Sequence, residues 1–261
     1  TYRMKSRRFF FRDANVGQNP PGGVIVDYLL NDPSGDVTLE FLDGSGNSIK
    51  TFKSSEEESK VTTQKGLNRF VWDMRYPDGT DITGGSHLFG GNLRGPVAVP
   101  GSYQVRLIAA GETKSASFDI KKDPRIDASP EDFQKQFDML IQIRDRVSDA
   151  HEGVNQILAV KKDLEKVSSD DKNISRQVKE VDEKLTAVLN ELVELRFRGI
   201  DDQMLVYPLQ LNAKIISLQR VLAGADRVRP IRPSRSSICC RLSSILSWRS
   251  SKPSWRMMSR R

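Results

Sequence analysis

The sequence has few of the residues on which many catalytic and metal sites depend. Its 261 residues include only two histidines, His87 and His151, and two cysteines, Cys239 and Cys240, near the C-terminus. Neither histidine has a cysteine or a second histidine nearby in the sequence, which argues against a zinc site. Because no cysteine precedes the last part of the chain, the cysteines also leave the redox compartment undecided.

Long apolar runs are missing as well. No stretch approaches the roughly 20 consecutive apolar residues of a transmembrane helix, which predicts that the chain has no membrane span. A composition of 37% hydrophobic and 29% charged residues instead suits a globular chain with a core. The sequence begins at Thr1 without a recognisable leader, so we expect a fragment of a longer protein.

Acidic residues are absent from the last part of the chain. Residues 227–261 contain nine Arg, one Lys and no Asp or Glu. The positive charge of this segment therefore exceeds the net charge of +7 of the whole chain. A tail rich in Ser and Arg is typical of a disordered basic segment that would bind nucleic acid by counterion release. A second interpretation is a translation shifted by one base, because the shifted frame permits an acidic, amphipathic helix. We therefore expect a disordered or frameshifted tail over 224–261 and no nucleic-acid partner.

In the first half of the chain, apolar and polar residues alternate as they do in half-buried β-strands. Extended runs at 24–30 and 37–42 precede a turn, Asp43–Asn47, and a third run at 48–53. The alternation continues in three more segments: Phe70, Trp72 and Met74; Tyr103, Val105 and Leu107; and Ala116, Phe118 and Ile120. Short strands bounded by Gly and Pro predict an Ig/fibronectin-like antiparallel β-sandwich over residues 19–122.

The second half has helical periodicity. Ser129 followed by Pro130 and two acidic residues predicts an N-cap, and apolar residues then recur at spacings of three and four up to Val167. After a polar break, a second apolar stripe runs from Ile174 to Leu195 with coiled-coil spacing. A third helix is predicted over 208–223, with a buried face made of Leu211, Ile215, Leu218 and Leu222.

These patterns together predict an α+β fold. The sandwich is followed by an antiparallel α-helical hairpin or bundle over residues 128–223. Because two helices leave part of their apolar stripes exposed, a third and a fourth helix are expected to cover them.

Candidate chemical sites are few. Glycosidase chemistry needs two carboxylates held across a bond, and the candidates are Asp73, after a predicted strand, and Asp78 and Asp81, in the Gly-rich loop 77–100. The sequence has no G-x-S-x-G nucleophile elbow and no phosphate-binding G-x-x-x-x-G-K-[ST]. No residue is therefore assigned as catalytic, cofactor-binding or metal-binding.

Arginines and aromatic residues give two further hypotheses. Arg69, Arg75 and Arg94 flank strands, and they either solvate a face of the sheet or form an anion site. Phe9–Phe11 is flanked by arginines and is predicted to pack against a preceding domain, because exposed aromatic clusters normally mark an interface. Residues 1–18 are accordingly a predicted linker from an upstream domain.

Five segments carry a resemblance to known proteins. They are GLNRFVWDMRYPDG (66–79), RGPVAVPGSYQVRL (94–107), KKDPRI (121–126), FQKQFDMLIQIRDRVSDAHEGVNQI (133–157) and YPLQLNAK (207–214). In this order they resemble the C-terminal region of bacterial glycosyl hydrolase family proteins that carry BNR (Asp-box) repeats in sortilin-like or sialidase-like β-propellers. No Asp-box, S-x-D-x-G-x-x-W, occurs in the chain itself, so no catalytic residue is carried over.

The resemblance implies an upstream β-propeller in the same parent chain, a secreted or periplasmic location, and a parent that acts on glycans. It gives a first hypothesis, a non-catalytic accessory module that stabilises or docks the propeller. The alternative is a part of the hydrolase that acts on glycans directly through the carboxylates of the 77–100 loop. The expected partners are the propeller and, through the parent, a glycan, and no cofactor is expected.

Overall fold

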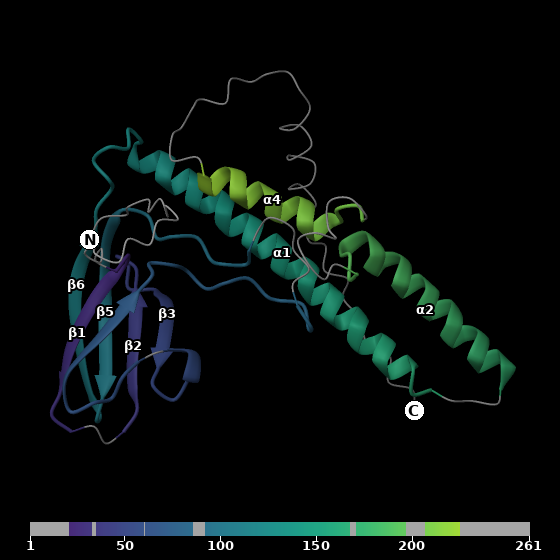
Figure 1. Ribbon diagram of the computed structural model, residues 1–261, viewed down its shortest axis with the longest axis horizontal. Coiled ribbons are helices and arrows are strands. Elements are labelled where there is room, and N and C mark those ends of the chain that lie inside the picture. The colour runs from purple at the N-terminus through teal and green to yellow at the C-terminus, as the bar shows by residue number, and fades with distance from the viewer. Residues whose placement is uncertain are drawn as a thin grey trace, which may run out of the picture. The chain divides into compact units, whose positions relative to one another are not determined.

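The computed structural model describes residues 21–32, 35–59, 61–85, 92–167, 171–196 and 207–224. In these residues the protein is of the mixed α+β class, with six strands in two antiparallel sheets and three α-helices (Figure 1). The predicted linker with Phe9–Phe11, His87 and residues 225–261 with both cysteines lie outside the described residues. The predictions for those segments remain predictions.

The strands form one sheet of two and one sheet of four. The first sheet pairs β1 (Val24–Leu30) with β4 (Gly66–Trp72), and the second has the order β3-β2-β5-β6. The strands of the second sheet are β3 (Ser48–Lys53), β2 (Val37–Leu42), β5 (Gly101–Ala109) and β6 (Glu112–Ile120). The first three predicted runs are thus confirmed with their bounds. A short 3-10 turn, Glu57–Ser59, follows β3.

The predicted turn between β2 and β3 is also confirmed. The Oδ1 atom of Asp43 accepts hydrogen bonds from the backbone N–H groups of Ser45 and Asn47, both at 2.9 Å. The side chain of Asn47, followed by these backbone groups, lowers the pKa of Asp43 below its ordinary value. Gly46 takes a φ of 86°, a left-handed conformation that glycine adopts without steric cost.

Residues from both sheets build one hydrophobic core. The ring of Phe41 on β2 stacks on that of Trp72 on β4, with centroids 4.4 Å apart, and Tyr103 on β5 meets Trp72 edge-on at 6.3 Å. Leu39 and Phe41 are fully buried. The alternation in the sequence therefore marks inward and outward positions, since successive side chains of a strand point to opposite faces.

The predicted continuation of β4 through Met74 is wrong. The strand ends at Trp72, and Met74 has a φ of 60°, which no strand contains. The carboxylate of Asp73 accepts a hydrogen bond from the backbone N–H of Arg75 and so favours a turn there. Met74 is still buried, and this burial explains why it fits the apolar alternation.

The two longest helices form the expected antiparallel hairpin. Helix α1 (Pro130–Leu164) begins with a reciprocal capping box between Ser129 and Asp132, and α2 (Lys172–Leu192) is capped by Asp171. The ammonium group of Lys161 on α1 binds Asp182 and Thr186 on α2. None of the described helices is both long and apolar enough to cross a membrane.

The third helix, α4 (Leu211–Gly224), packs along the N-terminal half of α1 (Figure 1). Its predicted buried face is wrong, because Leu211 is exposed and Leu222 is only half-buried. The buried residues are Asn212, Ala213, Ile216 and Gln219. Two of these are polar and have hydrogen-bonding partners in other elements, which an analysis of apolar spacing does not detect.

An ion pair shapes the connection between β6 and α1. The guanidinium of Arg125 donates to both carboxylate oxygens of Asp123, and its backbone N–H donates to Oδ1 at 3.0 Å. These side-chain bonds, followed by the backbone bond, lower the pKa of Asp123 from 3.8 to about 2. The Asp123 side chain is almost fully buried, whereas that of Arg125 is exposed.

The depressed pKa predicts a defined pH dependence. A carboxyl group whose pKa is lowered by folding stabilises the protein above its ordinary pKa of 3.8, and the contribution is lost as the pH falls through about 2. Asp123→Asn should lower the melting temperature at neutral pH. The difference in melting temperature between the variant and the parent should disappear as the pH falls from 3.8 to about 2. Thermal melts across the range test this expectation. Asp127→Asn, which changes an exposed acid in the same connection, is the matched control and should leave the melting temperature at neutral pH close to that of the parent.

Candidate functional site

The segment between β4 and β5 is the principal irregular element of the described chain. We call residues 74–85 and 92–98 of this segment the arm. Its two runs pair with each other through three backbone hydrogen bonds: Tyr76 N to Pro96 O, Gly79 N to Leu93 O, and Ala98 N to Met74 O. The Gly-rich loop expected over residues 77–100 is therefore a hydrogen-bonded ribbon in the part that is described.

Gly95 is required where the two runs approach most closely. A Cβ atom at this position would lie 2.1 Å from the carbonyl oxygen of Tyr76 and 2.4 Å from that of Pro77. Both obstacles are backbone atoms, which cannot move aside as the end of a side chain would. The side chain of Asp78 accepts a hydrogen bond from Gly95 N at 2.7 Å, which fixes the two runs further.

The arm reaches α1 and binds a row of polar side chains there (Figure 1). Ser148 Oγ accepts from Thr80 N, and Asn155 both accepts from Thr83 N and donates to Asp81 O. Arg144 donates to the carbonyl oxygen of Pro77. The helical residues of this row are Arg144, Ser148, His151 and Asn155. Their spacing of four, three and four places them on one face of α1.

His151 is the buried member of this row. Its Nδ1 lies 2.8 Å from the carbonyl oxygen of Thr80, which can only accept, so Nδ1 carries the proton. Its Nε2 lies 3.4 Å from the amide nitrogen of Asn212 on α4 and is thus placed to accept. The imidazole therefore links the arm, α1 and α4. No group of three or more His, Cys, Asp or Glu side chains suited to a metal ion occurs among the described residues.

An apolar contact anchors the end of the arm. Ile82 is only 2% exposed and belongs to a cluster with Val154 of α1, Leu189 of α2 and Val193. Burial of a side chain of this size stabilises by about 1.5–3 kcal/mol relative to exposure. The arm is therefore held to the helices by both polar and apolar contacts.

The candidate carboxylates accept hydrogen bonds from backbone N–H groups of the arm. Asp78 binds Gly95 N, and Asp81 Oδ1 accepts from Ile82 N at 2.7 Å. Asp73 binds Arg75 N and accepts from the guanidinium of Arg94 at 2.6 Å. Each carboxylate thus stabilises a turn, a backbone contact or an ion pair within the chain.

The three arginines that suggested an anion site are paired within the chain. Arg69 forms a bidentate contact with Asp27, at 2.7 and 2.9 Å, across the β1–β4 pair. Arg75 donates to the carbonyl oxygen of Gly95 at 2.8 Å. With Arg94 bound to Asp73, these side chains have carboxylate or carbonyl partners, which disfavours an anion site built from them.

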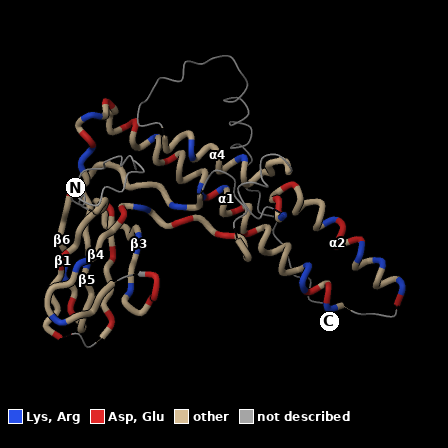
Figure 2. The backbone as a smooth tube through the Cα atoms, viewed as in Figure 1, with Lys and Arg blue, Asp and Glu red and all other residues tan. Residues whose placement is uncertain are grey.

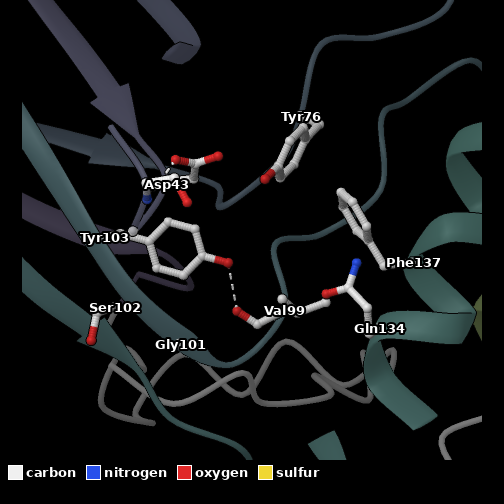
Figure 3. Close-up of a pocket in the computed structure, with 10 residues that line it drawn as sticks. Asp43, Tyr76, Val99, Gly101, Ser102, Tyr103, Gln134 and Phe137 are labelled. Carbon is white, nitrogen blue, oxygen red and sulfur yellow. Dashed lines mark hydrogen bonds between the residues drawn. The ribbon is translucent and has the colours of Figure 1, made fainter. Parts of the chain in front are cut away.

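One hollow of about 380 Å³ lies where the β2–β3 turn, the arm, β5 and α1 meet (Figure 3). Its lining includes Asp43, Tyr76, Tyr103, Gln134 and Phe137. The rings of Tyr76 and Phe137 meet edge to face at 4.7 Å, and the Tyr103 hydroxyl donates to Val99 O. Burial, followed by the nearby charge of Asp43, raises the pKa of Tyr76.

The acidic group in the lining of this hollow is bound within the chain. Asp43 is the one acid in its lining, and both of its oxygens accept hydrogen bonds within its own turn. The sequence gives no signal for the hollow, because its residues come from four separate segments.

Comparison with known proteins adds no family to this description. No protein-family model matches the chain, and no curated protein matches it significantly.

Proposed function

We propose that the chain is a non-catalytic accessory module from the C-terminal region of a secreted or periplasmic glycosyl hydrolase-like β-propeller protein. Its sheets would form an Ig/fibronectin-like sandwich, and its helices a supporting hairpin or bundle. The observation that carries the proposal is the arm, which uses its polar groups and Ile82 to attach the sheets to the helices. A rigid spacer needs such an attachment, whereas a catalytic loop needs free groups aimed at a substrate.

The outer face of the β1–β4 sheet supports a docking role. Leu29 and Leu67 lie opposite each other in the register and are 66% and 70% exposed, and Ile25 on the same strand as Leu29 is also exposed. The ion pair of Asp27 with Arg69 lies between Ile25 and the Leu29–Leu67 pair on the same face, so this face combines apolar and charged groups. Interfaces combine an apolar centre with polar groups in the same way. We assign this face to the contact with the upstream β-propeller, whose presence the sequence resemblance implies.

A binding experiment with the two parts tests this function. The chain should raise the melting temperature of the separately produced propeller, by an amount equivalent to about 2.7 kcal/mol at 100 times the dissociation constant. The double variant Leu29→Asp/Leu67→Asp should abolish this stabilisation. Val221→Asp, an equally exposed position on α4, serves as the matched control and should retain it. An unchanged propeller melting temperature would contradict the docking role.

An activity assay on the isolated chain distinguishes this accessory function from direct glycan hydrolysis. The isolated chain should not turn over an aryl glycoside. Turnover that is lost on Asp78→Asn or Asp81→Asn, with the fold retained by circular dichroism, would replace the accessory role with the hydrolytic one.

A further inference from the structure

The hollow where the β2–β3 turn, the arm, β5 and α1 meet has the size of a site for a small molecule (Figure 3). Its volume of about 380 Å³ lies within the range of about 300–1,000 Å³ that such sites occupy. Its lining includes aromatic and polar side chains: Asp43, Tyr76, Ser102, Tyr103, Gln134 and Phe137. The hollow shares none of these residues with the β1–β4 face proposed to contact the propeller, so its occupancy does not depend on that contact.

Asp43 is the one charged side chain among the described residues that line the hollow. Asn47 and nearby backbone N–H groups lower the pKa of Asp43, so its carboxylate is ionised at neutral pH. This carboxylate accepts two hydrogen bonds at Oδ1, from the backbone N–H groups of Ser45 and Asn47. It accepts one at Oδ2, from the side chain of Asn47 at 3.0 Å. Because a carboxylate has about four acceptor positions, Oδ2 retains one for a ligand.

The two hydroxyl groups that β5 contributes to the lining have already donated their protons within the chain. The Tyr103 hydroxyl donates to Val99 O, and the Ser102 hydroxyl donates to Asp119 Oδ1, both at 2.7 Å. A hydroxyl group has a single proton to donate. An anionic ligand, which needs donors, therefore gains no hydrogen bond from these two side chains.

The side chain of Gln134 on α1 also presents an acceptor. Its amide nitrogen donates to Asp138 Oδ1 at 2.8 Å, and its amide oxygen is the end turned toward the lining residue Val99 (Figure 3). The Tyr76 hydroxyl points into the hollow from the opposite side (Figure 3). With Oδ2 of Asp43, these oxygens give a lining rich in acceptors, which favours a positively charged ligand that carries N–H groups.

The aromatic part of the lining favours an organic cation over a metal ion. The rings of Tyr76 and Phe137 meet at 4.7 Å, and with Tyr103 they supply apolar surface on which carbon atoms can pack. Aromatic rings also attract cations through their negatively charged faces. A calcium ion needs about six to eight oxygen ligands, a requirement for which a half-aromatic lining with one carboxylate is poorly suited.

The preference for a cation depends on the hollow itself, because charges of both signs surround it. Lys and Arg are interspersed with Asp and Glu along the described strands and helices (Figure 2). Exposed charges more than about 10 Å away are largely screened at 0.1 M salt. The charge of Asp43, inside the lining, therefore acts on a bound ligand more strongly than the mixed charges outside it.

We propose that the hollow binds a primary alkylammonium group, supplied by a free amine or by the lysine side chain of a peptide. The N–H groups of the ammonium donate to Oδ2 of Asp43 and to the other acceptors of the lining. The carbon chain packs on the rings of Tyr76 and Phe137. Because Asp43 lies at an exposed turn, binding weakens as the salt concentration rises.

Titration of the full chain with n-butylammonium, followed by two-dimensional NMR, tests the proposal. The backbone amide signals of Gly44 and Ser102 and the side-chain amide signal of Gln134 should shift and saturate. The dissociation constant should be millimolar, because a ligand with few atoms binds weakly. n-Butanol, which is neutral, and tetramethylammonium, which lacks N–H groups, should each bind at least about ten-fold more weakly. Equal binding of n-butanol, or no saturable shift with n-butylammonium, would overturn the proposal.

The same titration with Nα-acetyl-lysine methylamide distinguishes the two sources of the ammonium group. Binding tighter than that of n-butylammonium supports a peptide lysine, because the peptide groups then add contacts of their own. Binding that is equal or weaker supports a free amine.

Asp43→Asn tests the charge while keeping the turn, because the asparagine oxygen still accepts from the N–H groups of Ser45 and Asn47. This variant should raise the dissociation constant of n-butylammonium at least about ten-fold, since the hydrogen bond is no longer charge-assisted. Asp36→Asn removes the same charge just before β2, whereas Asp43 follows β2, and this matched control should bind as the parent does. Unchanged binding by Asp43→Asn would exclude this carboxylate as the ligand of the ammonium group.

A variant with increased affinity guards against loss of binding through a damaged fold. Gln134→Glu places a second carboxylate at the hollow and should lower the dissociation constant of n-butylammonium about three-fold or more. Lys135→Gln changes the net charge by the same amount at the adjacent exposed position and is the matched control, with affinity close to that of the parent. If the two variants change the affinity equally, the cation responds to the charge of the molecule and not to the hollow, and the proposal fails.

Discussion

Replacing Trp72 with alanine should lower the free energy of unfolding by about 3–5 kcal/mol, the range found when a large aromatic side chain is removed from a core. Trp72 is fully buried on β4 and contacts Phe41 and Tyr103 of the other sheet. Its indole N–H also donates to Arg75 O at 3.2 Å. The alanine variant loses both the contact between the sheets and the bond that holds the turn after β4.

Chemical denaturation followed by far-ultraviolet circular dichroism measures this loss without relying on the removed fluorophore. Leu67→Ala is the matched control, because Leu67 lies on the same strand and is 70% exposed. It should change stability by no more than about 0.5 kcal/mol. Trp72→Phe should fall between the two, since it keeps a ring but removes the N–H donor. A cost below about 1 kcal/mol for Trp72→Ala would show that the sheets do not depend on a shared core.

The parts of the fold that follow from the sequence are those with local causes. The strands Val24–Leu30, Val37–Leu42 and Ser48–Lys53 were predictable because alternation and the Asp43–Asn47 turn act within a few residues. The start of α1 was predictable because Ser129 caps the helix through its own first turn. Neither feature needs a partner from elsewhere in the chain.

The predictions are wrong where a hydrogen bond to a polar group far away in the sequence determines which residues of a helix are buried. On α4, apolar spacing selects Leu211, whereas the structure buries Asn212 and Gln219. Gln219 donates to the carbonyl oxygen of Arg94, and Asn212 faces His151. Burying an amide is costly without a hydrogen-bonding partner and is acceptable with one. A single sequence does not reveal those partners, so the helix is assigned the wrong face.

The attachment of the arm to α1 does not follow from the sequence for a related reason. The arm meets α1 through contacts between residues that are about 70 positions apart, such as Thr80 with Ser148 and Thr83 with Asn155. One signal was nevertheless present. Arg144, Ser148, His151 and Asn155 form a polar row at helical spacing beside the apolar stripe of α1, and such a row can bind exposed backbone groups. An analysis of apolar periodicity alone does not detect this polar row.

Replacing Ile82 with alanine should lower the free energy of unfolding by about 2–4 kcal/mol, because the deletion leaves a cavity among Val154, Leu189 and Val193. This expectation distinguishes an anchored arm from a loop that merely lies on the helices. If the arm is anchored, the backbone bonds of Thr80 and Thr83 to α1 depend on Ile82 being in place. Their amide hydrogens should then exchange faster in the variant, measured by hydrogen–deuterium exchange.

The neighbouring variant Thr83→Ala separates this anchor from a general effect of mutation in the arm. Thr83 is exposed, and its contact with Asn155 uses the backbone N–H, which alanine retains. It should therefore change stability by no more than about 0.5 kcal/mol. The amides of β2 and β5, which lie in the shared sheet core, should exchange as in the parent when Ile82→Ala loosens only the arm. If Ile82→Ala and Thr83→Ala behave alike, the arm is not held by its apolar end, and the attachment of sheets to helices on which the accessory role depends is lost.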